Sequence, residues 1–121
     1  MRSGNVSLAP RPEILYNDER KEAVRVLYEW GERFEWDDEK ARLNYAKHKI
    51  RFETATAVFD DENRIEWYDA AHSEDEDRYN TIGMVRNILF VVYTERRDKI
   101  RIISARLATA EERRIYYAGD V

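Results

Sequence analysis

Four short apolar segments in the second half of the chain have the pattern of β-strands. They cover residues 64–69, 78–85, 88–95 and 99–106. Polar links of two residues, Arg86-Asn87 and Arg97-Asp98, separate the last three, as in antiparallel hairpins. The segments 88–95 and 99–106 are apolar on both faces, which predicts strands in the interior of a sheet.

Four other segments have helical patterns: residues 18–30, 38–48, 53–59 and 110–118. Asp37 is placed to cap the helix at 38–48. Thr109 opens the last helix, and Glu112 completes a capping box with it. Gly31 and Gly119 are positioned to end the first and the last helix.

The predicted order α, β, α, α, β, β, β, β, α favours an α+β domain with a mainly antiparallel sheet and helices packed on it. Residues 1–33 form a separate N-terminal extension in this interpretation, with a flexible arm at 1–16 and the helix at 18–30. Residues 34–121 form the main domain.

Composition limits the possible classes of protein. The 121 residues include no cysteine, which excludes disulfides and thiolate metal sites. No apolar run approaches the roughly 20 residues of a membrane span, and the N-terminus lacks the apolar region of a signal peptide. We therefore expect a cytoplasmic protein with no membrane association.

Charge is unevenly distributed along the chain. Residues 1–77 carry 12 Lys and Arg against 20 Asp and Glu, whereas residues 78–121 carry 9 against 5, so the two parts have net charges of −8 and +4. A basic C-terminal part can present a phosphate-binding surface although the whole chain is acidic. Uneven placement of ordinary surface charge is an equally good interpretation.

Several separated blocks of sequence carry a resemblance to a known family. The blocks are Phe34-Glu35-Trp36-Asp37 with Lys40, Asn44, Lys47-His48 and Phe52; His72 to Arg78; Val91 to Arg96; and Ile100 to Arg106 with Thr109 and Glu111 to Arg114. From about Phe34 to Tyr117 the chain resembles the BrnT family of bacterial toxins, which are similar to RelE-type ribonucleases. Members have a glycine after the basic pair Lys47-His48, where this chain has Lys49.

The resemblance implies a RelE-like fold and a toxin of a type II toxin–antitoxin system that cleaves RNA and so inhibits translation and growth. No cofactor and no metal are expected, because arginine and lysine side chains can supply the positive charge for this reaction. It also implies a partner, a BrnA-like antitoxin with a ribbon-helix-helix fold, in a heterotetramer of two toxins and two antitoxins. The alternative is a non-enzymatic module that binds nucleic acid or protein.

Cleavage of RNA by its own 2′-hydroxyl requires a proton acceptor, positive charge on the phosphorane and a proton for the leaving oxygen. His48 is the candidate for proton transfer, because histidine titrates near neutral pH. Lys47 beside it is a candidate phosphate ligand. Both residues also suit the last turn of a helix, where cations are favourable whatever the function.

Arg78 and Arg106 each end an apolar face of a strand, as do Ser104 and Thr94. We predicted that Ile100, Ile102, Ser104 and Arg106 share one face, so that the polar groups open a cleft at the end of the core. The arginines are candidate catalytic residues that grip phosphate, with Ser104 and Thr94 as orienting groups. An ion pair with a nearby carboxylate is the alternative for each arginine.

Two further arginines are candidate substrate-binding residues. Arg96 lies at a hairpin tip, and Arg113 lies on the last helix. That helix, with Ile115, Tyr116 and Tyr117, is also a candidate antitoxin contact. Both positions also suit ordinary exposed charges. The acidic run after His72 is interpreted as a solvated loop, because it lacks the glycine of a calcium loop and a second histidine at useful spacing.

Overall fold

The computed structural model describes residues 15–17, 22–24 and 27–120. Its elements are β1 (Leu15–Asn17), β2 (Glu22–Val24), β3 (Leu27–Trp30), β4 (Phe34–Asp37), α1 (Asp38–His48), α2 (Phe52–Thr56), the 3-10 turns η2 (Ala57–Asp60) and η3 (Ala70–His72), β5 (Ile65–Tyr68), β6 (Tyr79–Val85), β7 (Asn87–Arg96), β8 (Lys99–Leu107) and α3 (Ala110–Ala118). The prediction of an α+β protein is confirmed.

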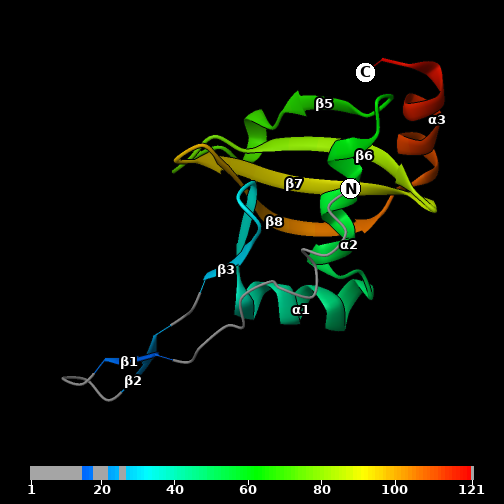
Figure 1. The fold of residues 1–121 in the computed structure, drawn as a ribbon. Helices are drawn as coiled ribbons and strands as arrows, with labels where there is room; N and C mark the ends of the chain where they lie inside the picture. Colours follow the sequence, from blue (N-terminus) through cyan, green and yellow to red (C-terminus); the bar gives the residue numbers. More distant parts are fainter. Residues whose placement is uncertain (1–14, 18–21, 25–26, 121) are drawn as a thin grey trace.

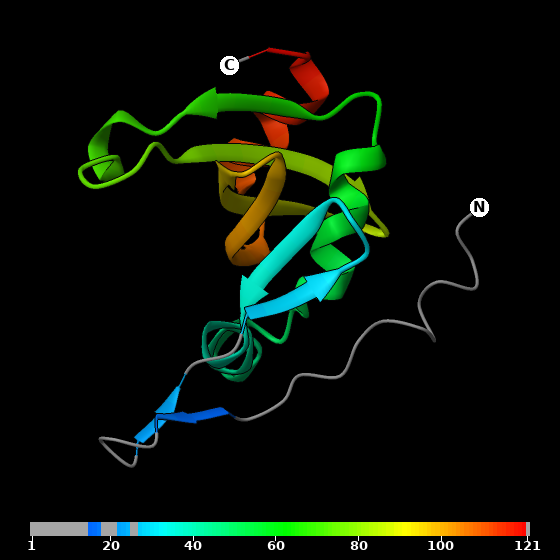
Figure 2. The same cartoon turned by 60° about the vertical axis from the view of Figure 1, so that its left-hand side comes forward.

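The central feature is a six-stranded mixed sheet with the order β3-β4-β8-β7-β6-β5. β4 and β8 are parallel, and the other neighbours are antiparallel. β7 and β8 lie inside the sheet, as their continuous apolar sequences predicted. Figure 1 shows α1 and α2 along one side of this sheet and α3 at the end of β6. β1 and β2 pair in a small sheet of their own, which Figure 2 shows beside the main one.

The predicted helix at 18–30 is wrong over its described residues. Residues 22–24 and 27–30 are the strands β2 and β3, and the remainder of that range lies outside the described residues, as do residues 1–14 of the predicted arm. The aromatic and β-branched residues of this stretch suit a strand as well as a helix. β3 pairs with β4, and Tyr28 lies opposite Trp36. The backbone groups at the edge of β4 can bond to a neighbouring strand but not to a helix, which favours the strand for residues 27–30.

The caps predicted for the two long helices are present. Asp37 accepts hydrogen bonds from the backbone N–H groups of Glu39 and Lys40 at the start of α1. Thr109 and Glu112 form the capping box of α3, and Gly119 ends that helix with φ 89°. Lys49 ends α1 in the left-handed region with φ 61°, the conformation that a glycine adopts at lower cost.

The turn that joins β6 to β7 and the turn that joins β7 to β8 differ in length. Arg97 and Asp98 have φ 51° and 70°, so β7 and β8 are joined by a two-residue turn as predicted. The predicted two-residue link Arg86-Asn87 is shorter, because Asn87 already pairs with Val85 and Arg86 alone turns the chain with φ 65°.

Candidate active site on the open sheet face

The two faces of the sheet are covered to different extents. On one face, Leu89, Val91 and Tyr93 are buried in the main core, which also takes in residues of α2 and η2. Phe90, Val92 and Thr94 alternate with them and lie on the opposite face. We call this opposite face the open face. There Phe90 and Val92 are only half-buried, and α3 covers one end through Tyr116 and Ile115.

A β-bulge decides which β8 side chains reach the open face. Tyr93 pairs with Ile102 and Val92 with Ser104, so one extra residue of β8 is inserted at this point. Ile102 and Ala105 both enter the main core, whereas Ser104 and Arg106 pair with the open-face residues Val92 and Phe90. The prediction that Ile100, Ile102, Ser104 and Arg106 share one face is therefore wrong, but Ser104 and Arg106 do share the open face.

Arg106 is held by a carboxylate at the end of the open face that α3 covers. Its two terminal nitrogens donate to the Glu112 carboxylate at 2.9 and 3.0 Å, and its guanidinium lies 4.1 Å from the centre of the Phe90 ring. Burial raises the pKa of Glu112, but the hydrogen bonds from Arg106 and Thr109 outweigh it and lower the pKa overall. The planar guanidinium is thus fixed in orientation before any substrate arrives.

Asn44 attaches α1 to the edge of β8. β4 pairs with β8 only at Ile100 and Arg101, so the later part of that edge has no strand beside it. The Asn44 side-chain amide donates to the Ala105 carbonyl at 2.9 Å and accepts from the Ala105 N–H at 3.1 Å. A second donation, to the Ile50 carbonyl at 3.0 Å, ties in the segment that follows α1.

His48 lies one helical turn after Asn44, at the end of α1, and Arg106 follows Ala105 on β8. The His48 ring is half-buried and Lys47 is exposed. The pKa of His48 is lowered by burial, then by the positive charges of Lys47 and Arg106. Arg106 is thus near enough for its charge to act on His48, and the neutral form of the imidazole, which can accept a proton, is favoured.

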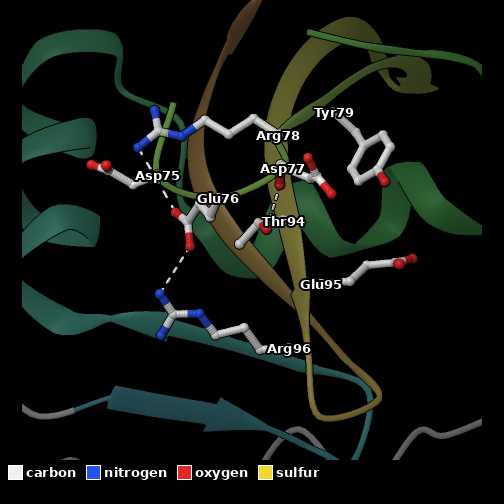
Figure 3. Close-up of a pocket in the computed structure, with 8 residues that line it drawn as sticks. All are labelled: Asp75, Glu76, Asp77, Arg78, Tyr79, Thr94, Glu95 and Arg96. Atoms are coloured by element: carbon white, nitrogen blue, oxygen red, sulfur yellow. Dashed lines mark hydrogen bonds and ion pairs between the residues drawn. The ribbon is translucent and has the colours of Figure 1, made fainter. Parts of the chain in front are cut away.

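The other end of the open face holds a second group of predicted residues. Glu76 accepts from Arg96 at 2.9 Å and lies 3.9 Å from an Arg78 nitrogen. Thr94 is 2% exposed and donates to the Asp77 carbonyl at 2.6 Å. Figure 3 shows Glu76 between the two guanidinium groups, with Thr94 beneath the loop. The Thr94 hydroxyl therefore anchors this loop in the structure.

The two groups are not adjacent. Arg106 pairs with Phe90, whereas Thr94, beside Arg78 and Arg96, is four residues further along β7. At about 3.3 Å per residue this separates them by roughly 13 Å along the strand. In the structure Arg106 pairs with Glu112 and Arg78 lies near Glu76, so the two arginines belong to separate groups, although the sequence predicted them as one cluster.

Asn80 lies between the two groups and was not predicted from the sequence. It pairs with Val92, which pairs in turn with Ser104, so all three residues form one row across the open face. Asn80 is 8% exposed, and among the described residues its side-chain oxygen is shielded from solvent and has no hydrogen-bond partner. The only indication of Asn80 in the sequence is that a polar residue occupies a position on the same strand face as Ile82.

Other polar candidates lie outside the two groups. Arg113 is exposed on α3. His72 is exposed and contacts Asp69 at 3.0 Å. Within the part of the chain that the structure describes, no three His, Asp or Glu side chains are placed to share a metal ion. None of the helices in that same part is long and apolar enough to cross a membrane.

Comparison with known proteins relates these features to one family. A family model described as the ribonuclease toxin BrnT of type II toxin–antitoxin systems matches residues 36–112. No curated protein matches the chain. Among solved structures, the chain is similar to the ribonuclease toxin BrnT of Brucella abortus, with 23% identity over 61% of this chain and 92% of that chain, and a TM-score of 0.46. The segment matched by the family model contains every candidate residue except Arg113.

Proposed function

Because the chain belongs to the BrnT family of ribonuclease toxins of type II toxin–antitoxin systems, we propose that it cleaves RNA on its open face without a metal ion. The observation that supports this site is that Asn44 ties α1, which carries Lys47 and His48, to β8 next to Arg106, whose charge acts on His48. An imidazole, an ammonium and a guanidinium can supply proton transfer and positive charge together.

In the proposed reaction the 2′-oxygen attacks the neighbouring phosphorus atom. His48, in its neutral form, takes the proton of the 2′-hydroxyl. Arg106 and Lys47 face the additional negative charge of the phosphorane. The bond from phosphorus to the 5′-oxygen then breaks, the leaving oxygen takes a proton from water, and His48 returns its proton to the solvent. The products carry a 2′,3′-cyclic phosphate and a 5′-hydroxyl.

The remaining candidates are proposed to bind the RNA on either side of the cleaved bond. Ser104, which is half-buried, lies between the two arginine groups, where its hydroxyl can bind the sugar or base of a nucleotide. Arg78 and Arg96 suit a neighbouring phosphate. Arg113 suits an RNA segment that passes α3. Thr94 acts indirectly in this proposal, through the loop that it anchors.

We expect cleavage of bulk RNA to continue at an unchanged rate in excess EDTA. The candidate groups at the reaction end are cations and an imidazole, not the carboxylates that hold magnesium. Gel electrophoresis of the RNA and end-group analysis of the fragments measure both the rate and the 2′,3′-cyclic phosphate. Cleavage that stops in EDTA and returns with magnesium contradicts the proposal. Binding without cleavage supports a non-enzymatic module.

The type II system implies an antitoxin partner, for which we propose a BrnA-like ribbon-helix-helix protein. Such a fold is a dimer, so two toxins and two antitoxins are the expected complex. Tyr116 is 9% exposed and lies in the core, which removes it from the contact surface that the last helix was predicted to offer. Tyr117, 67% exposed, and the exposed Arg113 remain available on α3.

We expect the product of a neighbouring antitoxin gene, when co-expressed with the chain, to co-elute with it as a heterotetramer and to prevent cleavage of RNA. Size-exclusion chromatography with light scattering gives the mass of the complex. Tyr117→Ala is expected to weaken it, whereas Leu43→Ala, an exposed apolar position on α1, serves as the control. Separate elution of the two proteins, with RNA still cut, contradicts this partner.

Three broader assignments belong to the same proposal. Residues 34–121 are taken as the toxin domain and residues 1–33 as an N-terminal extension, of which β3 pairs with β4 in the main sheet. The fold is taken to be RelE-like with a mainly antiparallel sheet, and the toxin is taken to act in the cytoplasm, where its RNA substrate is.

A further inference from the structure

Two arginines converge on a single carboxylate at the end of the open face away from His48. Arg96 donates to one Glu76 oxygen at 2.9 Å, and an Arg78 nitrogen lies 3.9 Å from the other. The side chains of Arg78 and Arg96 are 35% and 49% exposed, and that of Glu76 is 26% exposed. All three line an open hollow together with Asp75, Asp77, Tyr79, Thr94 and Glu95, and Figure 3 shows these lining residues.

The loop that carries Glu76 is fixed at both sides by contacts that do not involve the Glu76 side chain. Thr94 donates to the Asp77 carbonyl at 2.6 Å, and the Arg78 N–H donates to the Ser73 hydroxyl at 2.9 Å. The Glu76 carboxylate, in contrast, contacts only the two guanidinium groups among the interactions of the described residues. It can therefore leave them without unfolding the loop.

The position of Glu76 is one that a phosphate of an RNA strand can take. A phosphodiester presents two anionic oxygens, and arginine binds such a pair as readily as the two oxygens of a carboxylate. The site lies roughly 13 Å along β7 from the pairing position of Arg106. It is therefore suited to a phosphate other than the one that is cleaved.

We propose that Arg78 and Arg96 form a second phosphate subsite for the RNA backbone, and that Glu76 occupies this subsite in the free protein and must be displaced when RNA binds. This inference rests on the proposed function, since it takes the ligand to be RNA. The consequence is that Glu76 weakens RNA binding, because it competes with phosphate for the two arginines. Its ion pairs would otherwise be taken only as contacts that stabilise the fold.

The test compares Glu76→Gln with the unaltered chain. The probe is a short single-stranded RNA with 2′-O-methyl groups throughout, which cannot be cut by its own 2′-oxygen. Its affinity is measured by fluorescence anisotropy at salt concentrations from about 50 to 200 mM. We expect Glu76→Gln to bind about 3- to 10-fold more tightly at the low-salt end, with a steeper loss of affinity as salt rises, because two more cations meet phosphate.

Glu74→Gln is the matched control. Glu74 is exposed in the same loop and forms no ion pair with either arginine, so this variant makes the same change in net charge. A variant that combines Glu76→Gln with Arg78→Ala and Arg96→Ala is expected to lose the gain. Affinity of Glu76→Gln no higher than that of Glu74→Gln overturns the inference.

The outcome separates this inference from the proposed function, because the probe reports binding alone. A gain in affinity in a protein that cuts no RNA supports the subsite and contradicts the cleavage mechanism. Normal cleavage by the unaltered chain with no gain from Glu76→Gln contradicts the subsite only. Unchanged thermal unfolding of Glu76→Gln is the expected check on folding, since ion pairs this exposed contribute little to stability.

Discussion

Replacing Arg106 by alanine is expected to lower the rate of RNA cleavage by about 100-fold or more, which corresponds to about 2.7 kcal/mol of lost transition-state stabilisation. The guanidinium is oriented in advance by two hydrogen bonds to Glu112 and by the Phe90 ring. A group fixed in this way loses little freedom when it meets the phosphorane. Initial rates on a short single-stranded RNA at saturating concentration measure the effect.

The pH dependence of the same variant gives a second readout. Arg106 is one of the charges that lower the pKa of His48, so its removal raises that pKa. The neutral imidazole then persists only at higher pH, and the acidic limb of the rate profile moves to higher pH. Because burial also lowers the pKa of His48, the shift is assigned to the lost charge only when the variant is shown to be folded.

Two substitutions control for Arg106→Ala. Arg106→Lys keeps the charge but not the planar pair of donors, so an intermediate loss is expected. Arg114 lies exposed on α3, where it pairs with Glu111, and Arg114→Ala should leave the rate unchanged. If Arg106→Ala is folded and cleaves at the normal rate, Arg106 has no part in the reaction.

Replacing Asn44 by alanine is expected to lower the free energy of unfolding by about 2 to 4 kcal/mol. The side chain is 7% exposed, and it satisfies both the N–H and the carbonyl of Ala105 as well as the carbonyl of Ile50. Without it, buried backbone groups at the edge of β8 lose their partners. Urea unfolding followed by tryptophan fluorescence measures the loss, because Trp36 lies in the core.

The same substitution should also reduce cleavage in the fraction that remains folded, since Asn44 sets the position of the helix that carries His48. Asn44→Asp is the matched variant: it keeps an acceptor for the Ala105 N–H but loses the donor to the two carbonyls. We expect Asn44→Asp to be destabilised as well, because a buried carboxylate meets two carbonyl oxygens. A loss below about 0.5 kcal/mol for Asn44→Ala, the range of ordinary surface changes, contradicts the assigned role of this amide.

The sequence predicted the elements from α1 to α3 because their signals are local. Asp37 and Thr109 mark helix starts through hydrogen bonds that span two or three residues, and Arg97-Asp98 allows a two-residue turn. The segment 18–30 contains apolar residues at spacings that fit either a helix or a strand. Residues 27–30 of this segment form the strand β3 because they pair with β4. A helical pattern is recognised within one segment and therefore does not include this partner.

The bulge in β8 could not be predicted from the sequence. Ile100, Ile102 and Ile103 are all apolar, so the alternation of polar and apolar residues does not show which of them face the core. The prediction continued the alternation of Ile100 and Ile102 through Ser104 and Arg106. The bulge instead places Ser104 and Arg106 on the opposite face from Ile102. The sequence did identify the residues that the structure groups with His48. It did not show that Glu76 and Glu112 hold the candidate arginines, because Glu76 meets Arg96 across 20 positions of the chain.

Glu112 has two partners, and this ties the order of synthesis to the appearance of toxicity. The carboxylate closes the first turn of α3 through the Thr109 N–H and orients Arg106 at the same time. A nascent chain that has reached Leu107 already contains His48 and Arg106 but not this carboxylate. The proposed reaction centre is therefore completed only when α3 has been made and has folded onto the sheet, so a truncated or unfinished chain is expected not to cleave RNA.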